Sequence, residues 1–235
     1  MSSLVSEGYE VFRSVLSPGD IHSLRAAITE TLDRVAAALR ASGAASRPDA
    51  PLEERIDGIA QHDRAYAEAL FRAALADSHR DPRIEALSRH SRLTPLIAGL
   101  LAPLSRTGQV IRPRATSSAF SSARHPWHQD VVRPSVSGCG SVRLACWMPL
   151  TAVDGETGAL ELILGRRTEP LPHYHHQDGV FAIADENLPR APRRIIALCP
   201  GDVLVLDRYT PHRSLPLQHE RARWAIAMWV KAESR

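Results

Sequence analysis

Apolar residues recur at helical spacing in the first hundred positions of the chain. Between residues 17 and 41 they follow one another at intervals of three and four, which is typical of an amphipathic helix: Ile21, Leu24, Ile28, Leu32, Val35 and Leu39. Ser17 is suited to cap this helix, with Asp20 three residues later to complete a capping box. A second Ala- and Leu-rich pattern follows at 52–78, and shorter ones at 81–90 and 93–104. Residues 1–105 are therefore predicted to be largely helical.

Beyond residue 105 the pattern changes to short β-prone runs, which Gly, Pro, Asp and Asn residues separate. The runs span 109–120, 127–132, 141–150, 159–164, 193–199, 202–207 and 221–230. Many short strands at this spacing predict a β-sandwich or barrel. We expect a mainly β fold in one domain, 1–235, in which N-terminal helices flank a barrel core formed by residues 106–235.

Charge and cysteine content narrow the classes of function. The 29 Lys and Arg residues exceed the 26 Asp and Glu residues by three and are scattered rather than clustered, so nucleic-acid binding is not expected. Cys139, Cys146 and Cys199 form no C-x-x-C pair and are odd in number, which favours a reducing compartment. No apolar run reaches the ~18 residues of a membrane span, and the opening residues lack a secretory pattern. We expect a cytoplasmic protein without a membrane partner.

His-x-Asp triplets occur three times in the chain. The imidazole and the carboxylate of such a triplet can share a metal ion only if the backbone turns both to one side. His79 and Asp81 lie where one helical pattern ends and the next begins, and helical residues two apart do not face each other, so we interpret them as capping or solvated. His176 and Asp178 lie in a polar, Pro-flanked stretch with two further histidines, which predicts a surface loop.

The remaining triplet lies in "WHQDVV", residues 127–132, whose Trp and Val residues indicate a strand. Alternate residues of a strand share a face, so His128 and Asp130 point the same way. His212 is the candidate third ligand, 82 residues beyond Asp130, an interval long enough for the strands of a small barrel. Two histidines and one carboxylate form the facial triad that suits non-haem Fe(II) and leaves coordination positions open.

Four stretches, "WHQD", "CWMPLTAVDGETGALELILG", "PGDVLVLDRYTPHRSLP" and "RARWAIAMW", resemble the phytanoyl-CoA dioxygenase-like family of Fe(II)/2-oxoglutarate oxygenases. A weaker similarity extends to the opening "EGYEVFRSVLSPGDIHSLRAAI", so most of the chain is covered. The resemblance implies a double-stranded β-helix, a jelly-roll or cupin-like barrel with helices outside it, that uses Fe(II), 2-oxoglutarate and O₂. It matches His128, Asp130 and His212 to the iron ligands.

The resemblance also implies residues that hold 2-oxoglutarate. Arg223 matches the family's arginine, and a guanidinium is the best partner for a buried carboxylate because it binds through two parallel hydrogen bonds. Ser214 matches a hydroxyl that holds the same carboxylate. Trp147 matches a tryptophan near the cosubstrate, although burial alone also explains a tryptophan. Arg221 has the same strand parity as Arg223, so strand geometry alone does not separate the two.

With Asp130 in place, the resemblance implies hydroxylation of a small-molecule metabolite in specialised biosynthesis or catabolism. Desaturation and ring formation are alternative outcomes at the same site. Two other classes stay open: a metal-binding barrel that acts as an isomerase or hydrolase without 2-oxoglutarate, and a catalytically silent protein that binds a small molecule.

The sequence says least about substrate contacts. Five arginines near the early strands are candidates to receive a carboxylate or a phosphate: Arg112, Arg114, Arg124, Arg133 and Arg143. The polar insert 166–194 is a candidate lid, since long loops are often functional. The chain departs from the family at 164–167, "LGRR", where the family has "PGSH", and at Leu217, where it has Asn.

Overall fold

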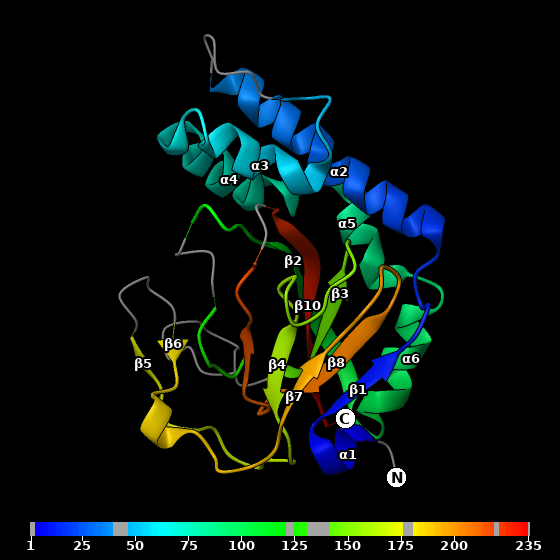
Figure 1. Cartoon of the computed structure of the whole chain (residues 1–235). Coiled ribbons are helices and arrows are strands. Elements are labelled where there is room, and N and C mark those ends of the chain that lie inside the picture. Colours follow the sequence, from blue (N-terminus) through cyan, green and yellow to red (C-terminus); the bar gives the residue numbers. More distant parts are fainter. Residues whose placement is uncertain are drawn as a thin grey trace.

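The computed structural model describes residues 3–39, 47–120, 125–130, 142–175, 181–218 and 221–234. Helices occupy the first hundred residues: α1 (Ser3–Glu7), α2 (Pro18–Ala38), α3 (Leu52–Ala60), α4 (Arg64–Ser78), α5 (Pro82–Glu85), the 3₁₀ helix η1 (Ala86–Arg89) and α6 (Leu93–Leu101). In Figure 1, α2, α3 and α4 form a group at the top of the view, and α5 and α6 lie along its right side. None of the described helices is both long enough and apolar enough to cross a membrane.

Helix boundaries follow the capping signals in the sequence. Ser17 Oγ accepts a hydrogen bond from the Asp20 amide at 3.1 Å, and the Asp20 carboxylate accepts one from the Ser17 amide at 2.7 Å, which completes the predicted capping box of α2. Asp81 caps α5 by accepting from the Arg83 amide at 2.9 Å, and His79 lies at the C-terminal end of α4. The interpretation of this His-x-Asp triplet as helix-terminal is confirmed.

The described strands form two main antiparallel sheets. The first sheet has five strands in the order β1 (Tyr9–Phe12), β8 (Val203–Asp207), β3 (Val142–Pro149), β10 (Arg223–Glu233) and β2 (Ser105–Thr116). The second has three, in the order β7 (Arg193–Ile196), β4 (Leu160–Ile163) and β9 (His212–Ser214). The insert adds the pair β5 (Tyr174–His175) and β6 (Phe181–Ala182) and the 3₁₀ helix η4 (Asp185–Asn187). The prediction of a mainly β fold with flanking helices is confirmed.

Alternate residues of β10 face two different cores. Trp224, Ile226 and Met228 belong to the cluster that joins the large sheet to the helices. Ala225 and Ala227 belong to a second cluster, which contains residues of both sheets and so lies between them. Because successive side chains of a strand point to opposite faces, one strand stabilises the helical layer and also lines the space between the sheets.

The strand predicted at 127–132 is present in the described residues, 127–130, only as a single bridge between His128 and His212. Two local features limit the pairing. Pro126 has no amide hydrogen to donate, and the Gln129 amide donates instead to the His173 ring at 3.1 Å. The segment is therefore a narrow strip beside β9 rather than a full strand of the sheet.

Replacing Trp224 with alanine is expected to lower the free energy of unfolding by about 3–5 kcal/mol. Trp224 is fully buried, its ring meets Phe71 edge-on with centroids 5.9 Å apart, and its indole N–H donates to the Leu52 carbonyl at 3.3 Å. Urea denaturation followed by circular dichroism measures the change. A loss within about 0.5 kcal/mol, the size seen for surface substitutions, would contradict this packing.

Candidate metal centre and its pocket

His128 and His212 lie directly opposite each other across an antiparallel bridge. The amide of each donates to the carbonyl of the other at 3.0 Å, so they form a hydrogen-bonded pair, in which the Cα atoms are about 5.5 Å apart. Their rings stand on the same side, with centroids 4.2 Å apart. Backbone pairing alone therefore brings together two imidazoles that are far apart in the sequence.

Hydrogen bonds to the backbone fix the same tautomer in both rings. His128 Nδ1 lies 2.8 Å from the Pro126 carbonyl, and His212 Nδ1 lies 3.1 Å from the Thr210 carbonyl. A carbonyl only accepts, so each Nδ1 carries the hydrogen and each Nε2 is left with a lone pair, the arrangement usual for metal-binding histidine. Burial, and then the neighbouring His212, lower the pKa of His128 to about 3, which keeps its ring neutral near pH 7.

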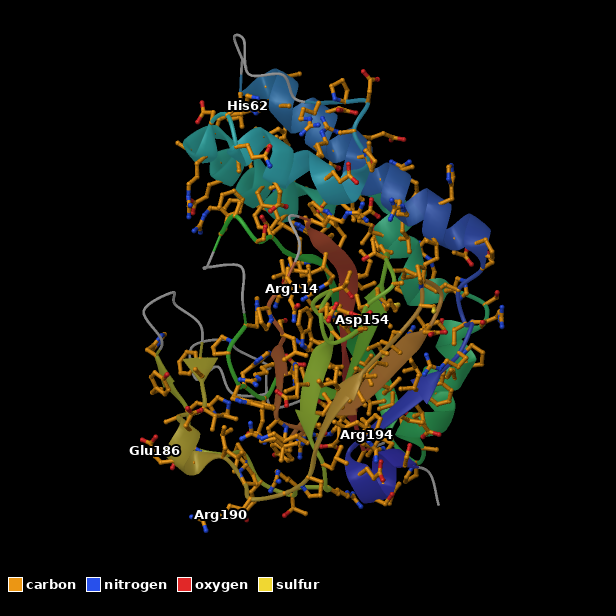
Figure 2. All side chains as sticks on the ribbon, viewed as in Figure 1. His62, Arg114, Asp154, Glu186, Arg190 and Arg194 are labelled. Atoms are coloured by element: carbon orange, nitrogen blue, oxygen red, sulfur yellow. The ribbon has the colours of Figure 1, made fainter. Side chains whose placement is uncertain are left out.

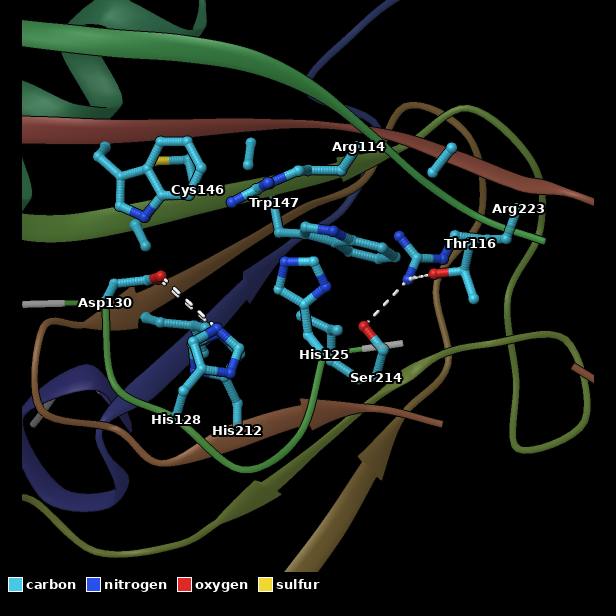
Figure 3. Close-up of a pocket in the computed structure, with 16 residues that line it drawn as sticks. Arg114, Thr116, His125, His128, Asp130, Cys146, Trp147, His212, Ser214 and Arg223 are labelled. Carbon is cyan, nitrogen blue, oxygen red and sulfur yellow. Dashed lines mark hydrogen bonds and ion pairs between the residues drawn. The ribbon is translucent and has the colours of Figure 1, made fainter. Parts of the chain in front are cut away.

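Asp130 completes the group. Its Oδ1 lies 3.8 Å from His128 Nε2 and its Oδ2 lies 3.8 Å from His212 Nε2 (Figure 3). The three residues offer ligand atoms that all lie within 4.8 Å of one another. Metal–ligand bonds to N and O are about 2.0–2.2 Å long, so small side-chain rotations bring these donors around one ion. The donor set of two imidazoles and one carboxylate fits a divalent transition metal with open coordination positions.

Trp229, on β10, holds the carboxylate of this group. Its indole N–H donates to Asp130. Burial alone would raise the pKa of Asp130, but His212, His128 and the Trp229 N–H favour the ionised form and bring the pKa below its ordinary value. Asp130 is therefore an anion that can ligate a cation. Trp229 was not predicted from the sequence, because nothing local links it to a residue 99 positions earlier.

Arg223 lies in the same pocket and is buried. Its Nη2 donates to Thr116 Oγ1 at 2.8 Å and to Ser214 Oγ at 3.1 Å, and its guanidinium carbon lies 5.1 Å from the centre of the Trp147 ring. Its Nε is buried and has no hydrogen-bond partner among the described residues. Burial, and then the charge of Arg114, lower the pKa of Arg223 to about 10, so it remains a cation at neutral pH.

Arg221, the competing arginine, lies elsewhere. It is largely exposed and pairs with Glu54 of α3, with 3.0 Å between Nη2 and Oε1. The residue precedes β10, whereas Arg223 is the first residue of that strand. Of the two arginines, only Arg223 lines the pocket that holds the His-Asp-His group.

The pocket has an empty volume of about 510 Å³, including its open mouth. Small side chains create much of this space, because Ala115, Ala145 and Ala227 line it where larger residues would fill it. The space that they leave lies beside the three candidate ligands.

His125, which was not predicted from the sequence, lies between the metal group and Arg223 (Figure 3). Its carbonyl accepts from the Ser214 amide at 3.0 Å, so the strip at 125–130 runs beside β9 at two points. Burial, and then the charge of Arg114, hold the pKa of His125 well below its ordinary value. Its neutral ring adds one donor and one acceptor to the wall of the pocket.

The five arginines proposed for substrate separate in the structure. Arg114 lines the pocket, with its guanidinium carbon 5.0 Å from the centre of the Trp229 ring. Arg112 is exposed and Arg143 is half-buried, and neither lines the pocket. Many other arginines extend outward, as Arg190 does, whereas Arg114 lies within the fold (Figure 2). Arg124 and Arg133 lie outside the described residues, as do His176 and Asp178 of the second His-Gln-Asp triplet.

A model of the phytanoyl-CoA dioxygenase family matches residues 4–224. The chain belongs to the phytanoyl-CoA dioxygenase (PhyH) family. The resemblance inferred from the sequence is therefore confirmed. No curated protein sequence matches the chain.

Solved structures with the same architecture have low sequence identity to this PhyH protein. The non-heme monooxygenase ThoJ is 20% identical with a TM-score of 0.63, over 98% of this chain and 76% of its own. The α-ketoglutarate-dependent carbocyclase SnoK from nogalamycin biosynthesis is 21% identical with a TM-score of 0.58, over 97% and 82%. EvdO2 from Micromonospora carbonacea var. aurantiaca, complexed with 2-oxoglutarate, is 19% identical with a TM-score of 0.53, over 99% and 90%. These likenesses establish the fold.

Replacing Trp229 with phenylalanine is expected to weaken divalent-metal binding by about 10-fold, because outer hydrogen-bond partners of ligands typically contribute 10- to 100-fold to affinity. The change removes the N–H that holds Asp130 and keeps an aromatic ring. Titration of the metal-free protein with Co(II) measures the affinity. Trp147→Phe is the matched control, since Trp147 lines the same pocket but stacks on Arg223; equal affinities in the two variants would contradict the role given to Trp229.

Proposed function

We propose that this PhyH protein is an Fe(II)/2-oxoglutarate-dependent oxygenase that oxidises a C–H bond of a small-molecule metabolite. One observation carries the proposal: a His-Asp-His group with available donor atoms and a buried arginine cation line a single pocket. Metal binding alone would explain the His-Asp-His group but not the buried arginine. The arginine indicates that an anion binds in the same pocket, which a simple isomerase or hydrolase site does not require.

The residues present fit Fe(II). His128, Asp130 and His212 would hold the ion on one face, and this donor set leaves positions open for a chelating cosubstrate and for O₂. When bound, Fe(II) together with O₂ and 2-oxoglutarate supplies the oxidising power, while the protein supplies binding and orientation. Fixed Nδ1–H bonds to Pro126 and Thr210 keep both imidazoles ready to ligate.

The pocket also fits 2-oxoglutarate, a dianion with a carboxylate at each end. Arg223 and Ser214 would hold the carboxylate far from the metal, and the buried Nε of Arg223 would gain the acceptor that it lacks among the described residues. A buried cation is costly without an anionic partner. Trp147, against the guanidinium, would shield this ion pair from water.

Hydroxylation is the outcome we propose first, because Asp130 occupies the carboxylate position of the triad and leaves no room there for a competing anionic ligand. Desaturation, epimerisation or ring formation would use the same residues and differ only in how the substrate is held. SnoK is described as a carbocyclase of nogalamycin biosynthesis, and this supports a specialised biosynthetic substrate for the present chain. The substrate would occupy the part of the pocket that Arg114 lines, because the space beside His125, between the metal group and Arg223, would be taken by 2-oxoglutarate.

Replacing Arg223 with leucine is expected to weaken 2-oxoglutarate binding on the order of 30-fold or more, since losing one partner of a buried charge pair costs about 2–5 kcal/mol. Anaerobic addition of Fe(II) and 2-oxoglutarate, followed by the visible charge-transfer band of the chelate, measures this affinity. Arg221→Leu is the matched control, because Arg221 pairs with Glu54 outside the pocket. A wild-type protein that binds Fe(II) but gives neither the band nor succinate after O₂ is admitted would end the proposal.

Replacing Asp130 with alanine is expected to abolish specific Fe(II) binding, because it removes the carboxylate that faces both imidazoles. Asp178→Ala changes the identical His-Gln-Asp sequence and is expected to bind Fe(II) like the wild type. Chelator competition under anaerobic conditions measures both affinities. Loss of binding in the Asp178 variant would show that the metal is held by the other triplet.

A further inference from the structure

The strip that carries two of the three candidate ligands, residues 125–130, has neighbours on both sides. On its inner side His128 pairs with β9. On its outer side lies the described part of the insert, residues 166–175 and 181–194. Figure 1 shows the strip, in green, between the orange β9 and the yellow β5–β6 pair. The contacts on the outer side are specific and connect the insert to the metal centre.

Gln129 makes the first of these contacts through a side chain that is almost entirely buried. Its Oε1 accepts from the Leu171 amide at 2.7 Å, and its Nε2 donates to the Tyr209 carbonyl at 2.5 Å. Leu171 belongs to the insert, whereas Tyr209 lies three residues before His212. Gln129 lies between His128 and Asp130 in the sequence. Its side-chain amide thus connects the segment that carries His212 to the insert.

His173 makes the second contact. Its Nδ1 lies 2.6 Å from the Leu171 carbonyl, so Nδ1 carries the hydrogen and Nε2 is the acceptor. That Nε2 accepts from the Gln129 amide at 3.1 Å. The His173 ring therefore has the same tautomer as the rings of the two candidate ligands, but its Nε2 lone pair accepts a hydrogen bond from the strip and is not available to a metal.

A small apolar core completes the outer side. Trp127, next to His128, packs with Ile163 of β4 and Ile183 of the insert, and the Ile183 amide donates to the Trp127 carbonyl at 2.7 Å. Leu171 and Leu188 of the insert pack on the same cluster. None of these insert residues lines the pocket. The described part of the insert therefore packs on the outer side of the strip, away from the pocket, and does not line the pocket.

We propose that the described part of the insert braces the metal centre and that Gln129 is the positioning residue through which it acts. Gln129, with His173, fixes the strip relative to the segment that carries His212, and so sets how the three donor groups meet. A side chain with one donor and one acceptor is needed at 129, because one neighbour presents an N–H and the other a carbonyl. This inference rests on the metal site proposed above.

The test uses the full chain, made metal-free, with Co(II) as the probe under anaerobic conditions. Gln129→Met keeps the length of the side chain and removes both amide bonds. His173→Phe keeps a ring and removes the acceptor, and His173→Gln restores an acceptor at the position of Nε2. His175→Phe is the matched control, since His175 is exposed, two residues away, and packs on Phe181 with ring centroids 4.1 Å apart.

We expect Gln129→Met and His173→Phe to bind Co(II) about 10- to 100-fold more weakly and to alter its visible d–d spectrum, which reports coordination geometry. His173→Gln should recover most of the affinity and the wild-type spectrum, a recovery that a general loss of folding would not give. Wild-type affinity and spectrum in both Gln129→Met and His173→Phe would overturn the brace and leave the metal site intact. A wild-type chain that does not bind Co(II) at all would instead refute the metal site. If Gln129→Met does not fold, the comparison of His173→Phe with His173→Gln tests the proposal by itself.

Discussion

The backbone pairing of His128 with His212 is the interaction on which the rest of the site depends. Two reciprocal amide–carbonyl bonds fix the separation of the two segments that carry the candidate ligands, and the common face of the pair turns both rings inward. The Nδ1 bonds to Pro126 and Thr210 then select the tautomer. Because these contacts use the main chain, the positions of both imidazoles are defined before a metal contributes any energy.

The two faces of the large sheet have different roles: one packs against the helices and stabilises the fold, and the other lines the pocket. Along β10, Trp224, Ile226 and Met228 fill the core beneath the helices, while the intervening residues face the other sheet. Arg223 and Trp229 belong to this second set and line the pocket. The period of two along a strand thus lets one element hold the helical layer, the far end of the pocket and the carboxylate of Asp130. Small residues between them, such as Ala227, leave space rather than fill it.

The sequence predicted those features that depend on local geometry. The capping box of Ser17 and Asp20, the common side of His128 and Asp130, and the alternation of the apolar strands all follow from short-range backbone rules. Strand parity did not separate Arg221 from Arg223, because the difference lies in what precedes β10: Arg221 is outside the strand and reaches α3.

Features that depend on distant partners were beyond prediction from sequence. The Gln129 side chain bonds away from the candidate ligands His128 and Asp130, and its partners are 42 and 80 positions away. Trp229 and His125 gain their roles only when β10 and the strip meet at the pocket. The insert, predicted as a candidate lid from its length and polarity, packs in its described part on Trp127 and the strip. The groups of the insert that bond to the strip, such as the Leu171 amide and the His173 ring, look in the sequence like those of an ordinary loop.

Electrostatics links the two ligands of the proposed function to each other. The described residues that line the pocket include two cations, Arg114 and Arg223, and a single carboxylate, Asp130. A divalent metal adds positive charge to a buried space that already has an excess of it, and such an excess is costly where water is excluded. In the proposed function, a dianion that chelates the metal at one end and meets Arg223 at the other would remove most of this excess. The metal and the cosubstrate would then stabilise each other's binding through the charge of the pocket as well as through direct coordination.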